Sequence, residues 1–124
     1  MGANAPGRLR LGRSARIKEG RDFSRIRQEG QRMTSGCLIA NWRLSKEGVA
    51  SRLGVITSSR IGNAVARSRA RRLLREAFRL HQHDLRAAVD LVLIARNSIL
   101  GKGLAEVEND FLTIMRKAGL SKQA

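Results

Sequence analysis

The spacing of apolar residues predicts two amphipathic helices in the second half of the chain. The first opens at Gly62 and Asn63 and runs to about His81, with Asn63 as its N-cap. The second covers about 104–117 and follows two glycines. Its apolar residues recur with helical spacing and form one stripe for packing: Leu104, Val107, Phe111, Ile114 and Met115.

The first half of the chain predicts one short helix, over 22–29, followed by strands. Strands are expected over 31–34, 38–44 and 52–57, and the last of these alternates with period two. A polar turn lies between the second and third strands, so we expect these two to pair as a hairpin. The segment 90–95 is a nearly continuous apolar run, typical of a central strand buried on both faces.

The order of these elements predicts a single domain. A strand, a long helix and a buried strand in succession indicate a βαβ crossover, for which a right-handed form is the general expectation. Residues 14–120 hold all the periodic segments. Residues 1–13 are mostly glycine, alanine, proline and arginine without apolar periodicity, and we interpret them as a flexible basic tail.

The long helix has two contrasting faces. At 100° per residue, its apolar positions fall in a sector of roughly 220° to 340° from Arg67. The opposite sector carries six arginines and one acid, Glu76. The apolar positions are Ala66, Ala70, Leu73, Leu74, Ala77 and Leu80. The basic positions are Arg67, Arg69, Arg71, Arg72, Arg75 and Arg79.

The charge of the chain indicates what kind of partner this face binds. The chain has 25 Lys and Arg against 10 Asp and Glu, a net charge of +15, which indicates a polyanionic partner. A merely solvated face would mix signs, whereas Arg67, Arg71 and Arg75 place like charges one turn apart. A membrane surface is the alternative, but the apolar face is rich in alanine and lacks Trp. Nucleic acid is therefore the favoured partner.

Other features exclude several classes of protein. Cys37 is the only cysteine, which rules out an intrachain disulfide and a multi-cysteine zinc site, and its apolar surroundings favour a core position. No apolar run approaches the roughly 20 residues of a membrane span. We therefore expect a cytoplasmic protein without a membrane partner.

The basic segment resembles the signature of the bacterial ribonuclease P protein. Residues 60–79 read Arg-Ile-Gly-Asn-Ala-Val-Ala-Arg-Ser-Arg-Ala-Arg-Arg-Leu-Leu-Arg-Glu-Ala-Phe-Arg. The family has a basic residue, Gly, Ala-Val, Arg-Asn-Arg, a basic pair, then Leu-Arg-Glu and Phe-Arg, with the same spacing. The resemblance also includes 21–23, 53–55 and 90–96, so it covers about residues 16 to 118.

The resemblance implies a fold and a division of labour. The fold would be a two-layer α/β sandwich of the α+β class, shared with a ribosomal protein domain, in which three helices pack on a mostly antiparallel sheet. Its βαβ crossover would be left-handed. The partners would be ribonuclease P RNA and precursor tRNA, with no obligate protein partner. Hydrolysis would belong to the RNA, and the holoenzyme would require Mg²⁺.

The resemblance also implies two binding surfaces. Contacts with the RNA subunit are expected from Arg60, Asn63, Arg67, Ser68, Arg69, Arg71, Arg72 and Arg75. The cleft for the 5′ leader of precursor tRNA is expected to hold Phe23, Arg27, Asn41 and Trp42. Ser68 stands where the family has Asn. Two cleft positions that are aromatic in the family are Arg27 and Asn41 here, so base stacking should be weaker.

The sequence offers no convincing catalytic set and no metal site of its own. The acidic residues are dispersed, and His81 and His83 diverge on a helix because they are two residues apart. Glu76 is expected to pair with Arg72 or Arg79. Two other hypotheses stay open: a structural RNA-binding protein, such as a ribosomal protein, and a nuclease that acts without RNA.

Overall fold

A computed structural model describes residues 16–17, 20–45 and 50–122 of the chain. The predicted tail, 1–13, and the predicted polar turn after the second strand, except for Ser45, lie outside these residues. The elements are α1 (Gly20–Glu29), β1 (Gln31–Ser35), β2 (Leu38–Leu44), β3 (Arg52–Ile56), η3 (Ser59–Ile61), α2 (Ala64–His81), η4 (Gln82–Asp84), β4 (Val89–Ala95), η5 (Asn97–Ile99) and α3 (Leu104–Lys117). Every predicted helix and strand is present, with its ends shifted by two residues at most.

The sheet has four strands in the order β1-β2-β4-β3. β1 pairs with β2 and β2 with β4 in antiparallel fashion, whereas β3 and β4 are parallel. The predicted hairpin of β2 with β3 is wrong, because β4 lies between them. β4 is buried along nearly its whole length and apolar except for Asp90, and it is an inner strand of the sheet. The predicted βαβ unit is confirmed as β3-α2-β4, and the hand of its crossover stays a prediction.

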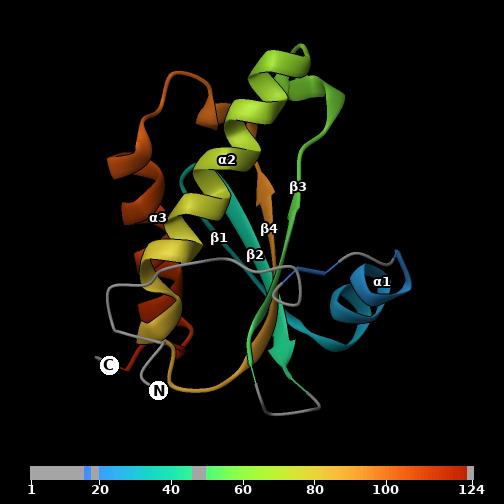
Figure 1. The fold of residues 1–124 in the computed structure, drawn as a ribbon, viewed down its shortest axis with the longest axis vertical. Helices are drawn as coiled ribbons and strands as arrows, with labels where there is room; N and C mark the ends of the chain where they lie inside the picture. Colours follow the sequence, from blue (N-terminus) through green and yellow to red (C-terminus); the bar gives the residue numbers. More distant parts are fainter. Residues whose placement is uncertain (1–15, 18–19, 46–49, 123–124) are drawn as a thin grey trace, which may run out of the picture.

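The helices lie on both faces of the sheet. α2 and α3 lie side by side against one face, and α1 lies on the other side of the strands (Figure 1). Alternate residues of β4 serve the two faces: Leu91 and Leu93 belong to the core under α2 and α3, and Val92 packs with Ile26 of α1. The mostly antiparallel sheet with three helices is thus confirmed.

The main core joins α2, α3 and the sheet. The rings of Phe78 and Phe111 meet edge to face, with centroids 6.5 Å apart, and both are fully buried. The predicted core position of Cys37 is confirmed by its burial. Burial, together with a hydrogen bond and the charge of Asp110, raises the pKa of the Cys37 thiol to about 12, so the thiol stays protonated.

A buried carboxylate connects α1 to the sheet. Asp90 of β4 is 1% exposed and accepts hydrogen bonds from Arg52 (2.9 and 3.0 Å) and from Arg43 (3.3 Å). Arg43 also binds Glu29 near the end of α1 (3.0 Å), and Arg52 lies 3.8 Å from Asp22 near its start. Burial raises the pKa of Asp90, but the bonds and charges of the two arginines outweigh it and lower the pKa.

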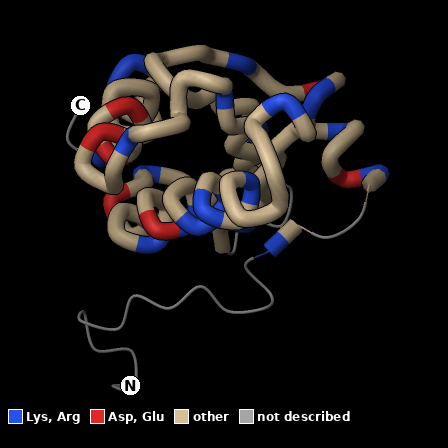
Figure 2. Tube along the Cα trace, turned by 90° about the horizontal axis from the view of Figure 1, so that it is seen from above, with Lys and Arg blue, Asp and Glu red and all other residues tan. Residues whose placement is uncertain are grey.

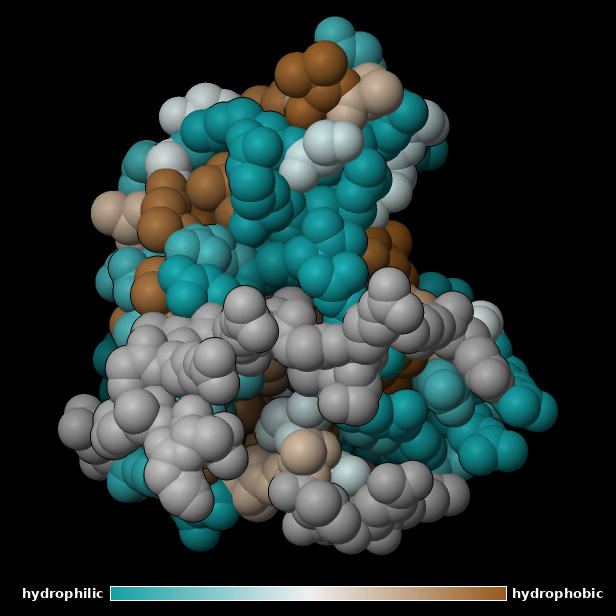
Figure 3. All heavy atoms as spheres, viewed as in Figure 1, coloured by the Kyte–Doolittle hydropathy of each residue, from teal (hydrophilic) through white to brown (hydrophobic). Residues whose placement is uncertain are grey.

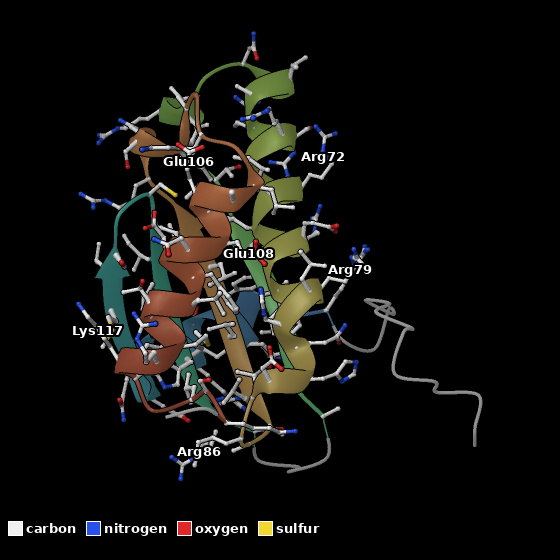
Figure 4. All side chains as sticks on the ribbon, turned by 90° about the vertical axis from the view of Figure 1, so that its left-hand side faces the viewer. Arg72, Arg79, Arg86, Glu106, Glu108 and Lys117 are labelled. Atoms are coloured by element: carbon white, nitrogen blue, oxygen red, sulfur yellow. The ribbon has the colours of Figure 1, made fainter. Side chains whose placement is uncertain are left out.

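His81 connects the end of α2 to α3. Its Nδ1 lies 3.1 Å from Asp84 and its Nε2 lies 2.5 Å from Glu108, which faces α2 in Figure 4. Burial lowers the pKa of His81, but hydrogen bonds to Glu108 and Asp84 outweigh it and raise the pKa.

We expect this contact to make stability depend on pH. A raised folded-state pKa stabilises the fold below the unfolded value of about 6.5, and the contribution is lost as pH rises through the folded value. Between pH 6 and pH 9 the wild type should therefore lose about 1 kcal/mol more than the His81→Gln variant. Thermal unfolding measured across this pH range tests it, with His83→Gln, an exposed histidine, as control. Parallel curves for wild type and His81→Gln would contradict it.

Candidate nucleic-acid interface

A capped turn sets the start of the basic helix. The Asn63 side chain accepts a hydrogen bond from the backbone N–H of Ala66 at 2.9 Å, which confirms it as the N-cap. Before it, Gly62 has a φ of 141°, a conformation that favours glycine. Arg67 donates to the Gly62 carbonyl oxygen at 2.6 Å, which ties the first turn of α2 to the incoming chain.

One row of arginines, Arg67, Arg71 and Arg75, occupies successive i,i+4 positions on the side of α2 that faces β3. Arg71 donates to the Thr57 hydroxyl, just after β3, at 2.9 Å, and to the Ser68 hydroxyl at 3.2 Å. Arg75 reaches a hollow at the edge of β3. Ser68 thus holds Arg71 with its one hydroxyl.

A second row, Arg69 and Arg72, lies on a different side of α2. Arg69 donates to the Lys102 carbonyl oxygen at 2.8 Å, toward the loop before α3. Arg72 is exposed and points away from the sheet (Figure 4). Both arginines line a shallow hollow together with Ser68, Ala64 and Val65. Val65 is 77% exposed, so this surface combines charge with an apolar side chain.

The basic face is left largely without internal counter-charges. Among the described residues, Arg79 is the only arginine of α2 with a carboxylate partner, Glu76, at 2.6 Å. This confirms the expected pairing of Glu76. Figure 2 shows Lys and Arg positions on several sides of the molecule, and in Figure 3 a hydrophilic area lies over the upper part of the face where α2 lies. Unpaired guanidinium groups on one helix are suited to phosphate.

The first helix brings an aromatic side chain to the sheet. Phe23 is partly buried against β3, where a side chain at Gly54 would place its Cβ only 2.6 Å from the Phe23 ring. Gly54 therefore permits the close approach of α1. Arg27 follows Phe23 by one helical turn and is exposed, so the two can share one surface.

Neither of the two predicted cleft residues on β2 is exposed. Trp42 is 5% exposed and belongs to the core under α2 and α3, so the prediction that it lines an open cleft is wrong. Asn41 faces the α1 side, but it is 4% exposed and its amide donates to the Gln31 carbonyl oxygen at 2.7 Å. The physical reason is the alternation of side chains along a strand, which sends neighbours to opposite faces.

The sequence did not point to a hollow that joins α1 and α2. It lies beside β3, and arginines from two segments enter it with the Phe23 ring. Its lining residues are Arg16, Ile17, Phe23, Leu53, Gly54, Val55 and Arg75. Arg16 precedes α1 and has no periodic pattern around it, so no sequence signal marked it.

Within the described residues, no three His, Cys, Asp or Glu side chains gather as metal ligands would. His81 is engaged with Asp84 and Glu108, and His83 is exposed. In the same part of the chain, no helix has the length and apolar character needed to cross a membrane.

The comparisons with known proteins agree with one another. A family model described as Ribonuclease P matches residues 11–119. The ribonuclease P protein component of Clostridium kluyveri is 34% identical over 109 residues, which are 86% of this chain and 96% of that protein. That of Shouchella clausii is 39% identical over 104 residues, 83% of this chain and 84% of that protein. The solved RNase P protein of Staphylococcus aureus superposes with a TM-score of 0.79 at 29% identity, covering 86% of this chain and 97% of that one.

Proposed function

The chain belongs to the ribonuclease P protein family, and from that premise we propose that it binds the catalytic RNA of ribonuclease P and the 5′ leader of precursor tRNA. In this role it assists removal of the leader, which yields the mature 5′ end of the tRNA. The observation that carries the proposal is the face of α2. Five of its arginines have no carboxylate partner among the described residues, and one of them, Arg75, lines a hollow beside β3 together with Phe23.

The RNA-subunit surface is proposed to centre on the start of α2. Of the residues predicted for this surface, five are exposed: Arg60, Asn63, Ser68, Arg69 and Arg72. Arg67 and Arg71 are partly buried by their hydrogen bonds, which orient their guanidinium groups. Arg75 was predicted for the same surface. Since each phosphate contact releases a counterion, binding should weaken steeply with salt.

The leader is proposed to lie along α1 and the sheet face that α1 leaves open. Phe23 provides an aromatic ring and Arg27 an exposed guanidinium group that can stack or pair with phosphate. On that face, Ile39, Ile56 and Ile94 are partly exposed instead of aromatic. Contacts of this kind tolerate any base, so we expect the protein to discriminate only weakly between leader sequences.

The cleavage step is assigned to the RNA subunit and its Mg²⁺ ions. Metal-dependent hydrolysis of a phosphodiester requires clustered ligands, whereas Asp90 and Glu76 are paired with arginines and no group of three metal-ligating side chains occurs among the described residues. The protein then contributes by holding the substrate and by reducing repulsion between two RNA molecules. No membrane and no obligate protein partner are required, and the cytoplasm is the proposed compartment.

A reconstitution tests the proposal. Precursor tRNA is incubated, at about 0.15 M salt and low magnesium, with the protein, with ribonuclease P RNA from the same organism, and with both. We expect cleavage at the mature 5′ end only with both components. Under high magnesium the RNA alone should regain activity, because ions then replace the charge of the protein.

The rival functions give different results in the same reaction. Cleavage by the protein alone, surviving nuclease treatment of the preparation, would establish a protein active site. No stimulation of the RNA at any magnesium concentration would favour a structural RNA-binding protein. In a separate binding measurement, a protein that raises the affinity for precursor and mature tRNA equally would contradict leader binding.

A further inference from the structure

The hollow beside β3 lies where the two proposed RNA surfaces meet. β3 is an edge strand, and the described residues add only a short bridge to its outer side, in which the Ile17 N–H donates to the Leu53 carbonyl oxygen at 2.8 Å. This bridge places Arg16 next to β3. Arg75 enters the hollow from α2 and Phe23 enters it from α1. Three segments that are distant in the sequence therefore converge on one place.

The charges in this hollow all have the same sign. Burial, and then the neighbouring charges of Arg16 and Arg71, lower the pKa of Arg75. Within the described residues, none of these three arginines has a carboxylate partner. Guanidinium groups that repel one another in a partly buried site gain stability when an anion lies between them.

The third component of the hollow is an aromatic ring. Phe23 lies against Gly54, and a Cβ at this position would clash with two atoms of the ring, at 2.6 and 2.7 Å. Gly54 therefore fixes how closely the ring approaches β3 and the arginines. A ring beside guanidinium groups suits a nucleotide, whose base stacks and whose phosphate accepts charge-assisted hydrogen bonds.

Other arginines of α2 belong to a different surface. Arg69 and Arg72 line the hollow that includes Val65, and Arg69 is bound to the Lys102 carbonyl oxygen on the α3 side. Neither residue lines the hollow that contains Phe23. The arginines of α2 thus line two different hollows, Arg75 the one beside β3, and Arg69 and Arg72 the one that includes Val65.

We propose that Arg16 and Arg75, beside the Phe23 ring, bind one phosphodiester of a single-stranded RNA segment, in a subsite separate from the surface of Arg69 and Arg72. The inference rests on the proposed function and moves Arg75 from the RNA-subunit surface to the substrate path. The leader is the proposed source of the phosphate, because the subsite is continuous with Phe23. A single-stranded part of the catalytic RNA is the other source of the same chemistry.

The test compares variants in the holoenzyme. Kd is measured for two substrates, precursor tRNA with a long leader and precursor tRNA with a leader of one nucleotide. The readout, called the leader advantage, is the Kd of the short-leader substrate divided by the Kd of the long-leader substrate. Arg75→Gln and Arg16→Gln should each reduce this ratio about tenfold, because each removes one charge-assisted contact. Arg72→Gln, the matched control on the same helix, should keep the ratio and weaken binding to the RNA subunit. Unchanged melting temperatures exclude unfolding as the cause.

A phosphate scan identifies the ligand atom. Single neutral methylphosphonate linkages are placed along the leader, and one position should weaken wild-type binding about as much as Arg75→Gln does. At that position the linkage should cost nothing further in the variant, since the contact is already lost.

The outcomes separate the inference from the proposed function. An intact leader advantage in Arg75→Gln would overturn the subsite. A loss confined to RNA-subunit affinity would overturn the leader as its ligand and assign the phosphate to the catalytic RNA. If the wild type itself has no leader advantage, the proposed leader binding fails first, and the subsite fails with it.

Discussion

Replacing Asp90 by Ala should lower the free energy of unfolding by about 3 kcal/mol, the largest effect that we expect from a single substitution. Asp90 is 1% exposed and binds Arg43 and Arg52 at once, and the Arg43 side chain is itself only 10% exposed. Removal of the Asp90 carboxylate leaves the buried positive charge without a partner. This lowers the free energy of unfolding by more than the loss of the hydrogen bonds alone. The cost also reaches α1, because the same arginines bind Asp22 and Glu29.

Urea denaturation of the purified variant measures this loss. Glu29→Gln is the matched control, because Glu29 binds the same Arg43 from an exposed position, and it should cost about 1 kcal/mol or less. A loss below about 1 kcal/mol for Asp90→Ala would show that water or neighbouring groups neutralise the arginines.

The same carboxylate predicts a loss of stability in acid. Its folded-state pKa is lowered, so its contribution is present above the unfolded value of about 3.9 and is lost as pH falls through the folded value. Asp90→Asn should therefore be less stable than wild type at neutral pH and approach it in strong acid. If the free energies of unfolding of wild type and Asp90→Asn differ by the same amount at every pH, the ionised form of Asp90 contributes nothing to stability.

The second large effect concerns RNA affinity. Replacing both Arg69 and Arg72 by Ala should weaken binding to ribonuclease P RNA about 30-fold at about 0.15 M salt and reduce the salt slope by nearly two, since each phosphate contact contributes about 0.9 to that slope. Both side chains are exposed on one surface of α2, and neither has a carboxylate partner among the described residues. The fold should remain stable because neither belongs to the core.

A control variant that loses the same number of positive charges separates the effect of this surface from the effect of net charge. Arg86→Ala with Lys117→Ala also removes two positive charges, from exposed positions far from Arg72 (Figure 4). Filter binding over a range of salt concentrations should give a wild-type slope for this control. Equal losses in the two double variants would mean that overall charge, not the surface of Arg69 and Arg72, determines affinity.

Helix positions followed from the sequence because their signals are local. Asn63 caps α2 as predicted, and the apolar stripe of α3 is buried at Val107, Phe111, Ile114 and Met115. Strand order did not follow, because it depends on competition between distant segments. β3 could have paired with β2, which is near in sequence, but β4 buries more apolar surface in the centre and separates them.

The candidate site was predictable where it lies on one helix and not where segments meet. The arginines of α2 were visible from periodicity alone. Arg16, Gly54 and Arg75 are distant in the sequence, and only the fold brings them to Phe23. Conversely, residues that are adjacent in the sequence can lie apart in the fold. Trp42 follows Asn41 directly, but it points to the opposite face of the sheet and packs in the core.

The place of β4 in the sheet has a consequence for synthesis on the ribosome. Among the described residues, β3 pairs within the sheet only with β4, whose residues follow it by nearly forty positions. A nascent chain that has released α2 but not Val89–Ala95 therefore has no completed sheet on which to pack that helix. We therefore expect the arginine surface of α2 to become ordered only after β4 has been synthesised, near the end of translation.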